Sequence, residues 1–493
     1  MQDQARKAHF WMVLDMFGGQ VIPFAIFLVI ARIIGPQAYG TFALAMAFVG
    51  LMSVVIYQGI ADALIQVPEL DERHVSTAFW MNLALASLIF LLVQALAGWV
   101  AELYHAPEME PVLRWIALLA PLQALISVQI ILFRRNLDTS VLARRTFVGR
   151  SVGGGVGVAL AFAGAGISSL VALQLVQAAV SVLVLWRADR WRPRPVFDLK
   201  EARAFARFGR HFMGATVITS LGTSADSLLV GLFLDPVMVG YYALAARLIE
   251  MARVLVLLPM RMLIMPVLSR LSDPKRFAAD YNEMARSVLA VWMPLLLALG
   301  TSADVLPVLF GAKWEGSVVL LEAMSLAAFT LPLWALAGDA LSATDRPELY
   351  LQLAATQVAI LAAGITAGAQ FGLTGVGLGW SAASACMVPI AFLALRKVCP
   401  MPWGPQLASA LRVAAAGLGF LAGFLAAFHL LAVLGWPSWT RSLIATGLGL
   451  VFYTALVEFI FLPGHVTRGL RSLRAVLVSR GVPSNAAPSR TAA

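Results

Sequence analysis

The sequence predicts an all-α integral membrane protein with about fourteen transmembrane helices. Three observations predict this class: the composition, the long apolar runs, and the alternation of basic and neutral loops. Of 493 residues, 60% are hydrophobic and 13% are charged, whereas soluble domains are about one-quarter charged. The mean hydropathy is +0.84. Because one water-soluble core cannot hide so much apolar surface, we expect the chain to reside in a membrane.

The apolar runs predict helices, because only helices and closed barrels satisfy the backbone in lipid and a barrel would show short alternating strands. A helical span needs about 20 apolar residues. The candidate spans are residues 10–33, 41–65, 77–99, 111–133, 144–164, 167–187, 209–233, 236–260, 286–309, 317–341, 349–369, 373–396, 406–434 and 440–462.

Basic residues gather in alternate loops, and the opposite loops carry only isolated cases such as Lys313 and Arg441. By the positive-inside rule, both termini face the cytoplasm, which requires an even number of spans. The net charge of +10 is therefore expected to set topology and to contact anionic lipid headgroups, not nucleic acid. The basic loops hold Arg6 and Lys7; Arg134, Arg135, Arg144 and Arg145; Arg187, Arg190, Arg192, Arg194, Lys200, Arg203 and Arg207; Arg270, Lys275 and Arg276; Arg396 and Lys397; and Arg468, Arg471, Arg474 and Arg480.

A long basic loop divides the chain into two halves, and a short repeat supports the division. Residues 35–45 (GPQAYGTFALA) and 235–245 (DPVMVGYYALA) share five positions at an offset of 200, each in the turn between the first two spans of its half. Six spans per half make this a parallel repeat; the alternative is chance similarity between two turns that precede Ala-rich helices. The predicted parts are a first lobe (1–187), a basic cytoplasmic linker (188–208) with amphipathic character, a second lobe (209–399), two further helices (400–463) and a basic, disordered cytoplasmic tail (464–493).

Several segments, in order and spacing, resemble the Wzx-type polysaccharide transporters of the multidrug/oligosaccharidyl-lipid/polysaccharide (MOP) flippase superfamily. They are ARIIGPQAYGTFALA (31–45), GIADALIQVPELDERHVSTAFWMNL (59–83), ILFRRNLD (131–138), DLKEARAFARFGRHF (198–212), SADSLLVGLFLDPVMVGYYALAARLIEM (224–251), LFGAKWEGS (309–317) and LSATDRPELY (341–350).

This resemblance implies two six-helix lobes around a central cavity, plus two C-terminal helices, in a bacterial inner membrane. It implies alternating access driven by ion exchange. The implied cargo is an undecaprenyl-pyrophosphate-linked oligosaccharide repeat unit, flipped from the cytoplasmic to the periplasmic leaflet for exopolysaccharide or lipopolysaccharide O-antigen assembly. A polysaccharide polymerase is the implied protein partner.

Charged residues inside the spans are the candidate functional residues, because a charge near the bilayer centre costs about 2.5–3.5 kcal/mol. Arg247, Glu250 and Arg253 are spaced by three in one span, so Glu250 can pair with one arginine and leaves the other charge unmatched. Arginine forks match pyrophosphate oxygens. We predict that Arg247, helped by Arg253, contacts the pyrophosphate; the alternative is ion pairing between helices or snorkelling.

Asp226 and Glu250 are the candidate ion-coupling groups, and Arg32 is a third candidate substrate contact. Asp226 lies ten residues before Pro236 and Arg247 lies eleven after it, so the two reach similar depth in a helical hairpin. They are expected to form a static ion pair or to exchange that pair for a proton. Arg32 directly precedes the repeat and is expected near the outer surface.

Three motifs that would indicate an enzyme or a metal are absent: the sequence has no GxxxxGK[ST], HExxH or DxD. Its two cysteines, Cys386 and Cys399, have no metal-ligand spacing. We therefore predict a transporter without cofactor or metal. Three alternatives stay open: a drug antiporter of the same superfamily, which would need an acidic cavity; a membrane-bound polysaccharide polymerase; and a flippase for the peptidoglycan precursor.

Overall fold

The computed structural model describes residues 22–52, 64, 71–136, 138–203, 205, 225–268, 274–342, 347–398 and 403–461. All regular elements in these ranges are helices, which confirms the predicted all-α class. Of the helices in the described ranges, nine are long and apolar enough to cross a membrane, or ten if a bent pair counts as one span. The count of fourteen stays a prediction. Asp226, Arg247 and the other candidate site residues lie within these ranges; the tail 464–493 lies outside them.

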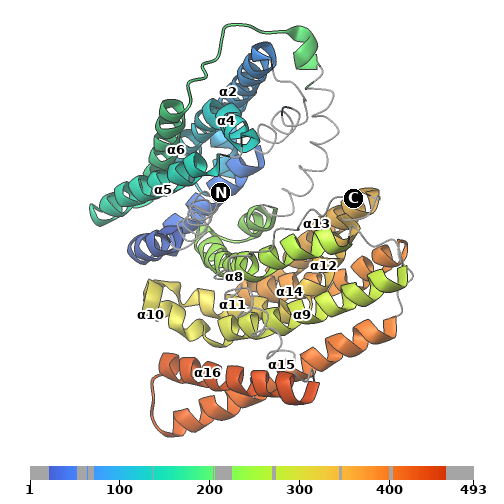
Figure 1. Cartoon of the computed structure of the whole chain (residues 1–493). Helices are drawn as coiled ribbons and strands as arrows, with labels where there is room; N and C mark the ends of the chain where they lie inside the picture. Colours follow the sequence, from blue (N-terminus) through green and yellow to red (C-terminus); the bar gives the residue numbers. More distant parts are fainter. Residues whose placement is uncertain are drawn as a thin grey trace, which may run out of the picture.

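The first group of helices comes before the basic linker and packs together, as Figure 1 shows in blue to green. Glycines let α5 approach α6 closely: a Cβ at Gly153 would lie 2.7 Å from the carbonyl oxygen of Leu173 and 2.9 Å from the backbone nitrogen of Gln177. The helices of this group are Ile22–Met52, α2 (Glu72–Leu103), α3 (Met109–Ile116), α4 (Leu119–Arg135), α5 (Thr139–Phe162) and α6 (Ser168–Ala188).

The second group begins with a helical segment at residues 225–233 and ends with the hairpin of α15 and α16, which packs against α9 (Figure 1). A 3-10 turn separates α11 from α12, which are bent by 54° relative to each other. The helices are α8 (Pro236–Leu268), α9 (Pro274–Thr301), α10 (Leu306–Phe310), α11 (Gly316–Ser325), α12 (Leu331–Ser342), α13 (Pro347–Ala369), α14 (Gly372–Arg396), α15 (Trp403–Val433) and α16 (Ser438–Leu456), followed by a π-helical turn, Val457–Phe461.

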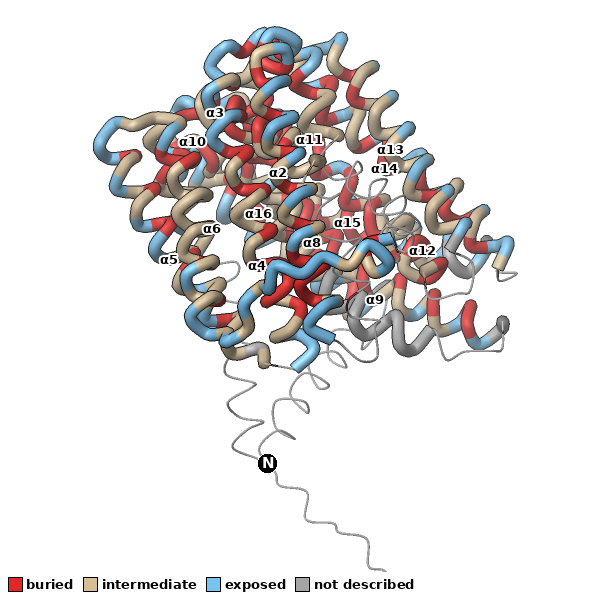
Figure 2. Tube along the Cα trace, turned by 90° about the horizontal axis from the view of Figure 1, so that it is seen from above, coloured by how far each residue is buried: buried red, intermediate tan, exposed pale blue. Residues whose placement is uncertain are grey.

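The outer faces of the helices are apolar, which is the pattern that lipid requires. Leu407, Leu411, Leu418 and Leu425 recur at helical spacing on α15 and are all more than half exposed. Figure 2 shows the same mixture of exposed and buried positions along the long helices. Soluble proteins rarely expose such continuous apolar surface. The chain is therefore a multi-pass membrane protein.

The helical run 22–52 reverses direction at Gly35, as the repeat predicted. Gly35 has a φ of +79°, which a glycine adopts without steric cost. The rings of Phe27 and Tyr39 are 5.1 Å apart, whereas twelve residues of straight helix would separate them by about 18 Å. The run is thus a hairpin of two helical arms, which we call the first hairpin. Residues 225–268 form the second hairpin.

The first part of the basic linker, residues 189–198, is docked on the start of α2. The backbone N–H of Arg194 donates to Ser76 Oγ at 3.2 Å, and that of Asp198 donates to Thr77 Oγ1 at 3.0 Å. Trp80 Nε1 donates to the Arg194 carbonyl at 2.8 Å. Residues 199–203 are helical, and most of the predicted amphipathic helix beyond them lies outside the described residues.

Candidate functional site

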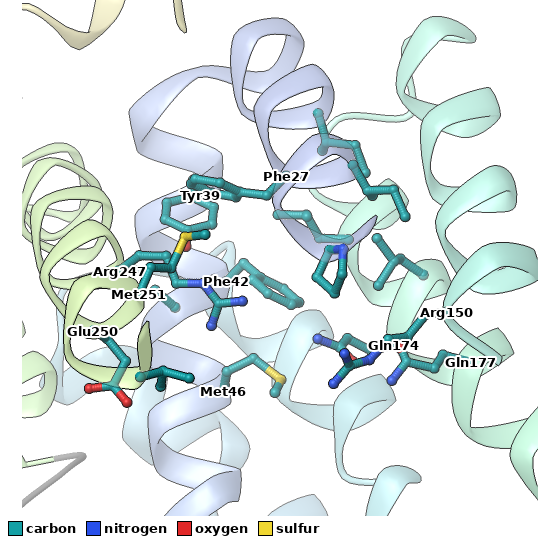
Figure 3. Close-up of a pocket in the computed structure, with 17 residues that line it drawn as sticks. Phe27, Tyr39, Phe42, Met46, Arg150, Gln174, Gln177, Arg247, Glu250 and Met251 are labelled. Carbon is teal, nitrogen blue, oxygen red and sulfur yellow. The ribbon is translucent and has the colours of Figure 1, made fainter. Parts of the chain in front are cut away.

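A cavity of about 550 Å³ lies between the first hairpin, α5, α6 and α8, so it is walled by both groups of helices (Figure 3). The first hairpin contributes mainly apolar and aromatic side chains, among them Phe27, Phe42 and Met46. The polar lining consists of Tyr39, Arg150, Gln174, Gln177, Arg247 and Glu250.

The cationic and amide side chains of the lining come from the middle of their helices. Arg247 follows Pro236 by eleven residues, so it lies about 16 Å along α8. Arg150 precedes Phe162 by twelve residues, about 18 Å from that end of α5. Gln177 follows Ser168 by nine, about 14 Å along α6. If these helices cross a hydrocarbon layer about 30 Å thick, such positions fall near its centre.

Glu250 pairs with Arg253 and not with Arg247. Arg253 Nε and Nη2 donate to the two Glu250 carboxylate oxygens at 2.6 and 2.7 Å. Among the described residues, Arg247 has no hydrogen bond or ion pair. In Figure 3 its guanidinium points into the cavity, while the Glu250 carboxylate points away. Glu250 thus pairs with one arginine of the triplet, as expected, and within the described residues the arginine left without a partner is Arg247.

Asp226 pairs with Tyr242 and not with Arg247. Tyr242 Oη donates to Asp226 Oδ2 at 2.8 Å, and the backbone N–H of Ser227 donates to Oδ1 at 2.7 Å. The expected ion pair with Arg247 is therefore not formed. Counting residues from Pro236 correctly predicted that Asp226 contacts α8. Arg247, however, is five residues beyond Tyr242 and is therefore rotated by about 140° around the helix. Tyr242 faces the interior and is fully buried, whereas Arg247 faces the cavity.

Arg32 lies outside the cavity lining. Its Nη1 donates to the carbonyl oxygens of Val308 and Leu309 at 3.3 and 3.1 Å. These carbonyls end the short helix α10, where the helix itself supplies no donor. Arg32 thus joins the first hairpin to α10, and its contact with substrate stays a prediction.

Arg150, Gln174 and Gln177 line the cavity and were not among the candidates derived from the sequence. Figure 3 shows them together on the wall opposite Arg247. Arg150 was detectable, because it lies six residues inside a predicted span, yet the basic residues just before it were read as loop signals. Gln174 and Gln177 are spaced by three in an otherwise apolar run, which places them on one helix face.

Comparison with solved structures defines the class of this protein. It superimposes on the lipid II flippase MurJ in an inward closed conformation with a TM-score of 0.71 and 14% identity, covering 92% of this chain and 98% of that chain. It superimposes on an inward-facing multidrug resistance MATE family transporter of the MOP superfamily with a TM-score of 0.63 and 14% identity, covering 76% and 93%. The chain therefore has the MurJ/MATE-like fold of the MOP superfamily; identity this low establishes the fold alone.

The sequence profile of the polysaccharide biosynthesis protein family matches residues 29–319, more than half of the chain, and the chain belongs to this family.

It is 27% identical over 318 residues to the succinoglycan biosynthesis transport protein ExoT of Rhizobium meliloti (strain 1021), covering 64% of each. It is 24% identical over 309 residues to the teichuronic acid biosynthesis protein TuaB of Bacillus subtilis (strain 168), covering 60% of this chain and 62% of that protein. The alignments thus span less than two thirds of these relatives. The lipopolysaccharide biosynthesis protein WzxC of Escherichia coli (strain K12) is 22% identical over 363 residues, covering 71% of this chain and 73% of WzxC. The predicted family resemblance is confirmed.

Proposed function

We propose that this protein is a flippase for undecaprenyl-pyrophosphate-linked oligosaccharide repeat units, and that Arg247 and Arg150 contact the pyrophosphate. The observation that carries the proposal is the Arg247 guanidinium, which faces the cavity between the two groups of helices without a protein partner in the described part of the chain. An unmatched charge at this depth costs free energy, which an anionic ligand would offset. Arginine is the side chain best shaped for bidentate contact with phosphate oxygens.

The opposite wall suits the sugar portion of such a cargo. The carboxamides of Gln174 and Gln177 each offer donors and an acceptor, which hydroxyl groups require. The first hairpin adds the aromatic faces of Tyr39 and Phe42. The names of the relatives ExoT and WzxC refer to polysaccharide synthesis or its transport, which supports the same cargo class.

Transport in this proposal proceeds by alternating access of two six-helix lobes in a bacterial inner membrane, with both termini cytoplasmic. Asp226 and Glu250 are the proposed ion-coupling groups, and Arg253 assists by holding Glu250. Asp226 is suited to proton exchange, because its carboxylate accepts a hydrogen bond from the neutral Tyr242 hydroxyl and is not paired with a permanent cation. A polysaccharide polymerase would receive the flipped repeat units.

The charge of the cavity argues against the drug-antiporter alternative. A cationic drug would require a net acidic lining, but the Arg247 guanidinium faces this cavity and the one lining glutamate is bound to Arg253. The likeness to MATE transporters supports a shared fold and does not extend to the cargo.

The decisive experiment measures the amount and sidedness of undecaprenyl-linked oligosaccharide in cells that lack this protein. Complete repeat units are expected to accumulate on the cytoplasmic leaflet, and the wild-type gene should clear them. Arg247→Ala should fail to clear them, whereas Arg276→Ala, which removes an exposed arginine at the start of α9, should succeed. Accumulation of unpolymerised units on the periplasmic leaflet would instead indicate a polymerase. No accumulation would show that the cargo is different.

A further inference from the structure

The two copies of the repeat contact each other directly through their glycines. A Cβ built on Gly40 would overlap the carbonyl oxygen of Pro236 and lie 2.7 Å from the backbone nitrogen of Gly240. A Cβ on Gly240 would overlap the carbonyl oxygen of Pro36 and lie 2.7 Å from its carbonyl carbon. Each glycine thus meets the proline that begins the other arm, at the same offset of 200. The first and second hairpins therefore cross reciprocally, backbone on backbone.

This crossing lies at one end of the cavity. Tyr39, adjacent to Gly40, lines the cavity, and so do Phe42 and Ala43 on the next turn of the same arm. A ligand that left the cavity between the two hairpins toward Gly35 and α10 would meet this crossing. The alternation of basic loops predicts that this is the outer, periplasmic end.

A tryptophan in the 3-10 turn between α10 and α11 covers the crossing and contacts both hairpins. Trp314 is fully buried, and its Nε1 donates to the Ala31 carbonyl at 3.0 Å. Its ring packs edge-on against Tyr39 at 5.8 Å and against Tyr241 at 6.4 Å. These two tyrosines are the direct chain neighbours of Gly40 and Gly240. Arg32 adds hydrogen bonds from the first hairpin to the end of α10.

We infer that Gly40 and Gly240 form the outer gate of the cavity, and that Trp314 holds this gate closed. The inference rests on the proposed transport by alternating access. The glycines are required because any side chain would separate the two backbones. In the closed gate the hairpins touch; in the open gate they part, and Trp314 leaves at least one of its two tyrosine contacts.

The gate can be tested by labelling a cysteine placed in the cavity. Ala43→Cys is introduced after Cys386 and Cys399 are replaced by alanine, and intact cells are treated with a membrane-impermeant maleimide. Gly40→Ala and Gly240→Ala should each raise the labelling rate at least about fivefold, because they disfavour the closed state. Gly50→Ala is the matched control: it lies on the same arm, and a Cβ there has no neighbouring atom within 4 Å. It should leave the rate unchanged.

Trp314→Phe provides a second variant that adds no volume at the crossing. It removes the hydrogen bond to Ala31 and should raise labelling by a smaller factor. The amount of each variant in the membrane is measured. If the glycine variants are not present in the membrane at wild-type levels, the labelling rate of Trp314→Phe tests the gate in their place. Unchanged labelling in well-expressed variants, or a rise seen only in inverted vesicles, would overturn the outer gate. Labelling needs no cargo, so this experiment tests the gate independently of the cargo. A negative labelling result would overturn the gate and leave the proposed lipid translocation intact. A negative translocation assay would overturn the proposed cargo and leave the gate intact.

Discussion

The first and second hairpins share one backbone arrangement but differ in their charges. Their turns lie 200 residues apart in the sequence, and both place a glycine at the crossing. The positions that correspond to Asp226 and Arg247 in the second hairpin are Ile26 and Ala47 in the first. Ile26 lines the cavity and packs against Gly154 of α5, whereas Asp226 accepts a hydrogen bond from Tyr242. The comparison teaches that the two copies share the close crossing, while of the two hairpins only the second contributes charged side chains to the cavity lining.

The largest effect on translocation is expected when Arg247, the cation that the second hairpin contributes to the cavity, is removed. Arg247→Ala should lower translocation of lipid-linked oligosaccharide at least about tenfold, because a bidentate charged contact is worth more than 1.4 kcal/mol. Arg247→Lys should retain part of the activity, since it keeps the charge and loses the planar fork. Translocation is measured in proteoliposomes of defined leaflet composition. Wild-type rates in Arg247→Ala would show that the asymmetry of charge has no role in cargo binding.

The second prediction transfers a charge to the first hairpin. Ile26→Asp should destabilise the protein by about 2.5–3.5 kcal/mol, because the counterpart of Tyr242 in the first hairpin is Phe42, which has no hydrogen-bond donor, and a carboxylate within a span is costly. Ile26→Asn is the control of equal size, and the difference in thermal midpoint between the two isolates the charge. Equal midpoints would indicate that the first hairpin tolerates charge as readily as the second.

Hydropathy predicts depth well and orientation around a helix poorly, and the two hairpins illustrate this. The apolar runs, the turn at Gly35 and the unmatched arginine followed from composition and spacing. The partner of Asp226 did not, because Tyr242 and Arg247 lie on the same helix and differ in the face they present. Arg32 bonds to carbonyls 276 and 277 residues away, a contact that only the folded chain defines. Gln174 and Gln177 are neutral, so no insertion cost distinguished them from ordinary span residues.

The third prediction tests coupling in the second hairpin. Asp226→Asn keeps an oxygen that can accept from the Ser227 N–H, and its amide NH2, in the place of Oδ2, can donate to the Tyr242 hydroxyl oxygen, so stability should change little. If Asp226 exchanges a proton during transport, this variant should transport more slowly and lose its dependence on pH. Tyr242→Phe is the control, since it removes the hydrogen bond and leaves the carboxylate. A pH profile identical to that of the wild type in Asp226→Asn would reduce Asp226 to a structural role.

The smallest expected effect concerns the pair of Glu250 and Arg253, one turn beyond Arg247. Both side chains are nearly half exposed, at 44% and 46%, so the pair is expected to contribute less than about 1 kcal/mol to stability. Glu250→Gln, Arg253→Gln and the double variant form a cycle that measures this coupling directly. Translocation should fall by less than in Arg247→Ala, because Glu250 and Arg253 already bond to each other. If Glu250→Gln instead abolishes translocation and its pH dependence while stability is kept, then Glu250, on the cavity wall, carries the coupling that Asp226 was expected to carry. The division between the hairpins would stand in either case, since both carboxylates belong to the second.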